Sequence, residues 1–100
     1  LKYKKKSVFL SFDIDSIKAS ECPGVSCPGN RGLSAKDALY MCMAAGASGQ
    51  IGMFDISELN PLYDDSISPR LVANMIIYFL MGLCIPESKS KKERAFLIID

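Results

Sequence analysis

The 100-residue sequence predicts an α/β domain with a central parallel sheet. Two mostly apolar runs, residues 8–15 and 51–57, have the length and hydrophobicity of strands buried on both faces. Each is followed by a segment with helical character, residues 35–45 and 69–83, which gives the order strand, helix, strand, helix. Ligands of such sheets bind beyond the carboxyl ends of the strands, and in this sequence each predicted strand has acidic residues at its carboxyl end.

The first strand turns acidic only at its end, where Asp13 and Asp15 stand. On a regular strand, residues two apart share a face and are attached about 6.5–7 Å apart. At an effective dielectric constant near 20, two carboxylates at that separation repel by about 2 kcal/mol. A divalent cation would turn this repulsion into attraction, whereas the alternative is a solvated strand end with two exposed aspartates. The spacing alone leaves both interpretations open.

Turn chemistry separates this strand from the first helix. The loop of residues 20–32 is rich in Pro, Gly, Cys and Ser, which excludes a helix or strand there. Ser34, three residues before Asp37, predicts a helix N-cap, and Gly46 predicts a left-handed helix end.

The second strand, residues 51–57, leaves the sheet through Glu58 and Pro61. Ser68 and Pro69 predict the N-cap and first position of a second helix. Its apolar face is predicted to comprise Leu71, Val72, Met75, Ile76, Phe79, Leu80 and Leu83. Residues 89–94 form a charged run that predicts a solvated segment, and residues 95–100 predict either a last strand or the start of a tail.

The composition, with 49% hydrophobic and 23% charged residues and a net charge of +1, is that of a soluble globular protein and disfavours nucleic-acid binding. Four cysteines without a secretory segment predict reduced thiols and a cytoplasmic location. Cys22 and Cys27 lack the further ligands of a zinc site, since the chain has no histidine. The longest apolar stretch, residues 71–85, is shorter than the roughly 20 residues that span a bilayer, so no membrane segment is expected.

Two ordered motifs carry a family resemblance. The run Ser11-Phe12-Asp13-Ile14-Asp15, followed by Ala19, Pro23-Gly24 and Gly32, fits every fixed position of the ureohydrolase signature of arginases, agmatinases and formiminoglutamases. The segment Phe-Asp-Ile-Ser-Glu-Leu-Asn-Pro at residues 54–61 is similar to the family's Asp-x-x-Glu-x-Asn-Pro. The two Cys-Pro-Gly segments resemble the formiminoglutamase branch. The resemblance covers about residues 8–83.

The resemblance implies a fold and its extent. Residues 1–100 would be the C-terminal portion of a single ureohydrolase domain, with part of the three-layer α/β/α arginase-like fold and its central parallel sheet. Both ends of the chain lie close to strand-like runs, and we therefore expect a fragment of a longer protein.

The same resemblance implies the chemistry. Asp13 would bridge two manganese ions and Asp15 would ligate one of them, while Glu58 would bind the cationic nitrogens of the substrate. The implied reaction is hydrolysis of a linear amidine, N-formimino-L-glutamate to L-glutamate and formamide, with arginine or agmatine as alternative substrates. No catalytic residue beyond the metal ligands is implied, and a homo-oligomer, a trimer or hexamer, is expected.

Two departures from the family pattern limit this chain. The remaining metal ligands lie upstream in the family and include histidine, which this chain lacks, so we expect the fragment alone to be inactive. Lys18-Ala19 replaces the Asp-Pro of many relatives and places a cation near the site.

Other functional interpretations stay open at this point. A non-catalytic ureohydrolase-like subunit is disfavoured by the intact Asp13 and Asp15, and a small metal-free binding domain leaves the two motif matches to chance. Glu58 could instead be a loop carboxylate that caps a turn.

Overall fold

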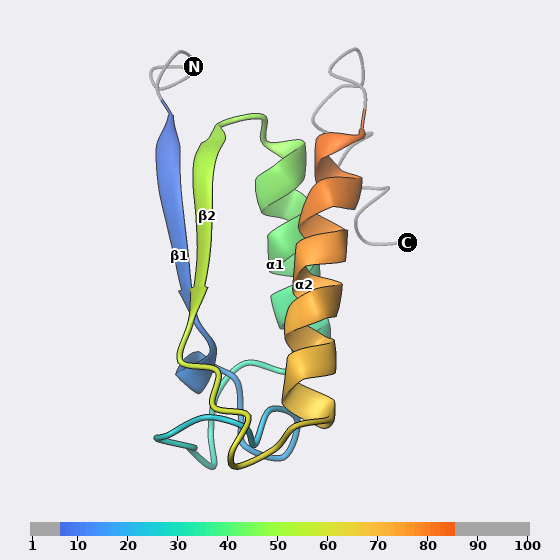
Figure 1. The fold of residues 1–100 in the computed structure, drawn as a ribbon. Coiled ribbons are helices and arrows are strands. Elements are labelled where there is room, and N and C mark those ends of the chain that lie inside the picture. The colour runs from blue at the N-terminus through green and yellow to red at the C-terminus, as the bar shows by residue number, and fades with distance from the viewer. Residues whose placement is uncertain (1–6, 86–100) are drawn as a thin grey trace.

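The computed structural model describes residues 7–85, which form two strands, a short 3-10 turn and two helices. In chain order these are β1 (Val8–Asp13), η1 (Ile14–Ser16), α1 (Ala35–Ala47), β2 (Ile51–Ser57) and α2 (Ile67–Leu83). The strands pair in parallel, and both helices lie beside them (Figure 1). Both strands end and both helices begin at the same end of the molecule (Figure 1). The predicted α/β class is confirmed in partial form; residues 89–94 and 95–100 lie outside the described residues.

The first strand ends earlier than the sequence predicts. Asp13 is its last residue, and Asp15 lies in η1. The cause is local, because the Asp15 N–H donates to Asp13 Oδ1 at 2.9 Å and the Ser16 hydroxyl donates to the Asp13 carbonyl at 2.6 Å. Such side-chain bonds compete with a strand ladder. The prediction that Asp13 and Asp15 share one face of a strand is therefore wrong.

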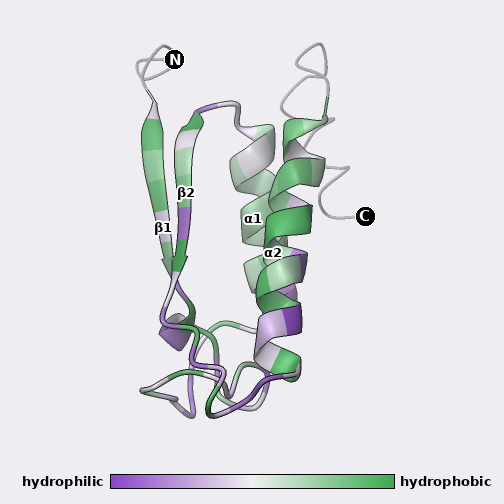
Figure 2. Cartoon of the chain, in the orientation of Figure 1, coloured by the Kyte–Doolittle hydropathy of each residue, from purple (hydrophilic) through white to green (hydrophobic). Residues whose placement is uncertain are grey.

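The parallel pairing sets Asp13 beside Ser57, the last residue of β2. The prediction that the strands are buried on both faces is wrong for the described residues, because Phe9 and Met53 remain 59% and 62% exposed there. Phe9 alternates along β1 with the inward, buried Phe12, so it projects from the face opposite the core. The hydropathy colouring shows that both strands are nonetheless largely apolar (Figure 2).

Helix α1 confirms one predicted end and corrects the other. The Asp37 N–H donates to the Ser34 hydroxyl at 3.0 Å, as expected of an N-cap. Gly46, predicted to end the helix, lies inside it and is buried. A Cβ there would overlap the Phe79 carbonyl oxygen, so this glycine is needed where α1 and α2 approach closely. The left-handed residue after the helix is Gly49, with φ 69°.

Helix α2 begins two residues before the predicted start. Ser66 precedes it, and Ser68, predicted as the N-cap, lies in its first turn. The cap comes from Asp64, whose carboxylate accepts the N–H groups of Ser66 and Ile67 at 3.1 Å and of Ser68 at 2.6 Å. These bonds, the one from Ser68 foremost, lower the pKa of Asp64 to about 2.

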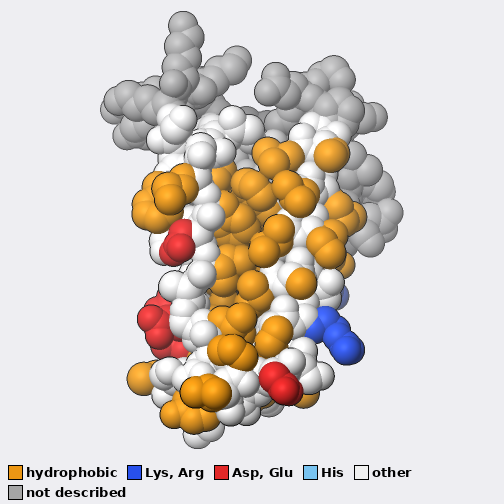
Figure 3. Space-filling model, in the orientation of Figure 1, with side chains coloured by type: hydrophobic (Ala, Val, Ile, Leu, Met, Phe, Trp, Pro, Cys, Tyr) orange, Lys and Arg blue, Asp and Glu red, His pale blue; other side chains and the backbone are white. Residues whose placement is uncertain are grey.

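The core joins the loop after β1 to both helices. Its buried members are Phe12, Ile14, Ile17, Cys22, Val25, Ala38, Cys42, Leu71 and Met75. The predicted apolar face of α2 is only partly buried, since Ile76, Leu80 and Leu83 stay about half exposed. Figure 3 shows apolar side chains gathered between the strands and α2. Within residues 7–85 no helix is long and apolar enough to cross a membrane.

Candidate metal centre

The two aspartates at the end of β1 offer carboxylate oxygens of different character. Asp13 is exposed, and one of its oxygens accepts the N–H of Asp15. Asp15 is partly buried, and its Oδ1 is fully buried without a hydrogen-bond partner among the described residues. An unpaired buried carboxylate oxygen is costly unless a cation or a donor compensates it. Because manganese prefers such oxygen ligands, these residues fit a manganese site.

The ligand set is incomplete in this part of the protein. Between residues 7 and 85, no group of three or more His, Cys, Asp or Glu side chains could hold a metal ion. Asp13 and Asp15 would therefore supply only part of a coordination sphere within this region.

Glu58 lies at the same end of the sheet. It directly follows Ser57, the register partner of Asp13. Its side chain is exposed, and its backbone has φ 77°, an unfavourable left-handed conformation for a non-glycine residue. Such strained residues cluster at ligand sites. No hydrogen bond of its carboxylate to a turn occurs within residues 7–85, so the turn-cap alternative gains no support.

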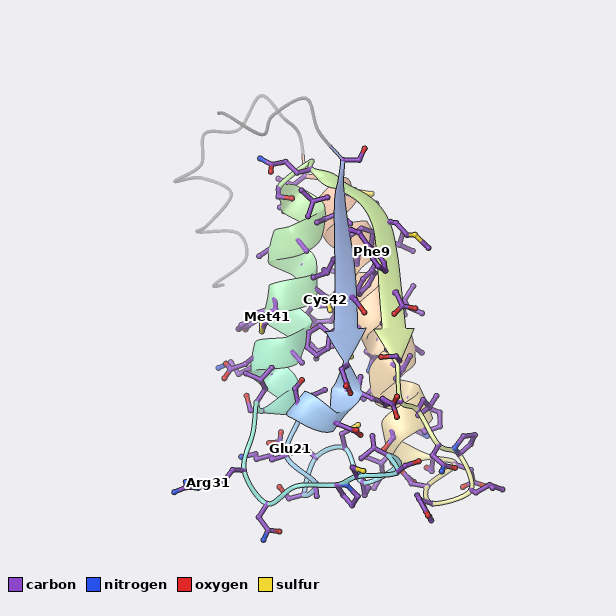
Figure 4. All side chains as sticks on the ribbon, turned by 90° about the vertical axis from the view of Figure 1, so that its left-hand side faces the viewer. Phe9, Glu21, Arg31, Met41 and Cys42 are labelled. Carbon is purple, nitrogen blue, oxygen red and sulfur yellow. The ribbon has the colours of Figure 1, made fainter. Side chains whose placement is uncertain are left out.

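The ammonium group of Lys18 forms an ion pair with the nearby Glu21. Its Nζ lies 3.1 Å from Glu21 Oε2, and the Ala35 N–H donates to Glu21 Oε1 at 3.1 Å. The Lys18 bond first, and the Ala35 bond second, lower the pKa of the Glu21 carboxyl. Glu21 thereby ties the loop after β1 to the start of α1, beside the sheet end that carries the site (Figure 4).

Two of the four cysteines are buried and two are exposed. Burial raises the pKa of the Cys22 thiol, and it raises that of Cys42 to about 11. These two side chains therefore remain protonated at neutral pH, Cys42 as a small apolar group and Cys22 in hydrogen-bond contact with the Ser68 side chain. Cys27 and Cys84 are exposed free thiols.

The structure also contains contacts that the sequence did not predict, and they brace the turn that carries Glu58 against the loop after β1 and the start of α2. The Gly24 N–H donates to the buried Ser68 hydroxyl at 2.7 Å, and the Asn60 N–H donates to the Gly24 carbonyl at 2.7 Å. The first joins residues 44 apart. No local pattern signals a contact of that length, and Ser68 beside Pro69 resembled an ordinary helix start.

Comparisons with known proteins agree with this arrangement. The Arginase family model matches residues 1–82. The formimidoylglutamase of Rhodococcus jostii is 39% identical over 70 residues, which are 69% of this chain and 22% of that protein. A crystal structure of Trypanosoma cruzi formiminoglutamase with Mn2+ superimposes with a TM-score of 0.78 at 47% identity, covering 82% of this chain and 29% of that one.

Arginase structures are also similar. Entamoeba histolytica arginase in complex with L-ornithine matches with a TM-score of 0.72 at 31% identity, over 75% of this chain and 26% of that one. The chain thus spans less than a third of the length of the relatives it matches. These matches confirm the arginase-like fold and the resemblance to formiminoglutamases. The family model, which matches most of the sequence, shows that the chain belongs to the arginase family.

Proposed function

We propose that the full-length protein hydrolyses a C–N bond of a linear amidine with the help of manganese, and that its substrate is N-formimino-L-glutamate. The observation that carries this proposal is the unpaired, buried Oδ1 of Asp15 next to Asp13, at the carboxyl end of a parallel strand in an arginase-family chain. The names of the related formimidoylglutamases support the substrate.

The residues of this chain would have distinct roles. The carboxylate oxygens of Asp13 and Asp15 would supply some of the ligands of a pair of manganese ions. Manganese, when bound, supplies Lewis-acid activation of water near neutral pH. Glu58 would bind the cationic amidine nitrogens through charge-assisted hydrogen bonds. Histidine is absent from the chain, so the remaining ligands would come from other parts of the full-length protein.

The test uses the full-length protein loaded with manganese. Formamide release from N-formimino-L-glutamate is measured beside urea release from arginine, and with an Asp13→Asn variant. We expect manganese-dependent turnover of the formimino substrate and a loss of at least about a hundredfold in the variant, since second-shell changes alone often cost 10–100-fold.

The results of this assay distinguish the proposed activity from arginase activity and from a non-catalytic subunit. Faster turnover of arginine would assign arginase activity instead. Absence of both manganese binding and turnover would favour a non-catalytic ureohydrolase-like subunit. A homo-oligomeric state and a cytoplasmic location remain predictions, the first open to light scattering of the full-length protein.

A further inference from the structure

Ser68 is a fully buried polar residue whose hydroxyl faces the loop after β1 rather than its own helix. The Gly24 N–H donates to its Oγ at 2.7 Å. The fit is tight, because a Cβ at Gly24 would lie only 2.8 Å from both Cβ and Oγ of Ser68. A displacement of either residue must therefore displace the other.

Gly24 is in turn hydrogen-bonded to the turn that carries Glu58. Its carbonyl accepts the Asn60 N–H at 2.7 Å, two residues beyond Glu58. Between them, Leu59 forms an antiparallel bridge with Val25. On the other side of Glu58, Ser57 pairs with Asp13 in the sheet. The strained backbone of Glu58 is thus held between the sheet and the Ser68–Gly24 contact.

The Asn60 side chain fixes the same turn independently. Its Nδ2 donates to the Ser26 hydroxyl at 3.1 Å, and its Oδ1 accepts the Leu62 N–H at 3.1 Å. The loop after β1 and the loop after β2 are therefore bonded at two neighbouring points.

The Ser68 side chain also bonds the Asp64 carboxylate, but that carboxylate caps α2 through the backbone N–H groups. Asp64 accepts the first N–H groups of that helix, including the one of Ser68. A role in the helix cap alone therefore does not account for the bond from the Gly24 N–H to this buried hydroxyl.

We propose that Ser68 is a positioning residue that acts through Gly24 and Asn60 to fix Glu58 relative to Asp13. The inference rests on the proposed function, which assigns Glu58 to the cationic end of the substrate. Removal of the hydroxyl frees the Glu58 turn to relax. Asp13 and Asp15 stay in place, because β1 and η1 hold them through their own bonds.

The first test compares Ser68→Ala with the unmodified full-length, manganese-loaded protein. We expect KM for N-formimino-L-glutamate to rise about tenfold, while kcat and the manganese concentration for half-maximal activity change less than about twofold, the pattern of lost substrate binding. Ser48→Ala is the matched control, since its hydroxyl also accepts a backbone N–H, from Gln50 at 3.2 Å, and it should leave KM unchanged.

A second test asks whether Ser68 acts through Glu58. In a Glu58→Gln background, Ser68→Ala should add no further rise in KM, because groups that act in series are not additive. Should Ser68→Ala fail to fold, Asn60→Ala loosens the same turn and should raise KM in the normal background only.

An unchanged KM in the single variants, or an equal rise in both backgrounds, would overturn the inference while wild-type turnover leaves the proposed function standing. Absence of turnover by the wild-type protein would overturn both.

Discussion

Asp64 accepts hydrogen bonds from three successive backbone N–H groups although it lies outside α2. Those N–H groups have no partner within the helix, and a carboxylate near the positive end of the helix dipole satisfies them. The ionised form is the one that is stabilised, so the pKa falls from its ordinary value of 3.8 to about 2. This one side chain links the start of α2 to the pH of the solution.

Replacement of Asp64 should therefore change the pH dependence of stability. Because the folded-state pKa is depressed, the contribution of the carboxylate is complete above about pH 4 and is lost as the pH falls toward 2. Asp64→Asn, which can still accept hydrogen bonds, should lower the melting temperature of the full-length protein at pH 7 by less than Asp64→Ala does. The difference between wild type and Asp64→Asn should shrink between pH 4 and pH 2.

Thermal melts by circular dichroism at pH 7, 4 and 3 would measure this difference. A gap between wild type and Asp64→Asn that stays constant over this range would contradict the assignment of Asp64 as the ionised cap.

At the level of elements, the contact between α1 and α2 depends on glycines. A Cβ at Gly46 would overlap the Phe79 carbonyl oxygen, and one at Gly82 would overlap the Met43 carbonyl oxygen. Backbone atoms cannot rotate away as side chains do, so an added methyl group would have to push the helices apart. That displacement would disturb the packing of Phe54 on Phe79, whose ring centroids are 4.6 Å apart.

Gly46→Ala should consequently destabilise the protein, although replacing glycine by alanine within a helix usually stabilises it. Alanine in a helix normally stabilises by about 1 kcal/mol relative to glycine, whereas overpacking at this contact should destabilise by about 1–3 kcal/mol. Chemical denaturation of the full-length protein would give the free energy of unfolding. Ala44→Gly, at an exposed position of the same helix, measures the propensity effect alone. A stabilised Gly46→Ala variant would show that the helices can separate without cost.

The sequence predicted the elements better than their ends. Hydrophobic patterns located both strands and the second helix. The first helix was located by its Ser34 cap, which was confirmed because its bond to Asp37 is local. The errors at Asp15, Gly46 and Ser68 have a shared cause. Each of these residues takes part in a contact whose partner, or whose competing local bond, is not specified by periodicity.

The candidate site shows the same division. Asp13, Asp15 and Glu58 were found from their motifs, and the structure brings them to one end of the sheet. The bracing contact between Gly24 and Ser68 was missed, since it joins residues 44 apart.

At the scale of the whole molecule, the described residues 7–85 form a sheet of only two strands and leave Phe9, Met53 and the outer side of α2 exposed. Exposed apolar area of this kind, together with open strand edges, favours association with further chain. In longer relatives the matched region is less than a third of the protein.

The isolated 100 residues should therefore aggregate or remain partly unfolded. Size-exclusion chromatography and the binding of a hydrophobic dye would detect either state, and the full-length protein is the control. A sharp, reversible, two-state melt of the isolated chain would contradict this prediction.

The length of two contacts also bears on how the protein is made. Ser11 pairs with Asp55, and Gly24 with Ser68, each across 44 residues of sequence. At about 5–20 residues per second, a ribosome needs roughly 2–9 s to synthesise such an interval. During that time the nascent segment bearing Asp13 and Asp15 has neither its neighbouring strand nor its brace. The turn that carries Glu58 can be fixed relative to Asp13 only after α2 has begun to emerge, so this end of the sheet is completed late in the synthesis of the region.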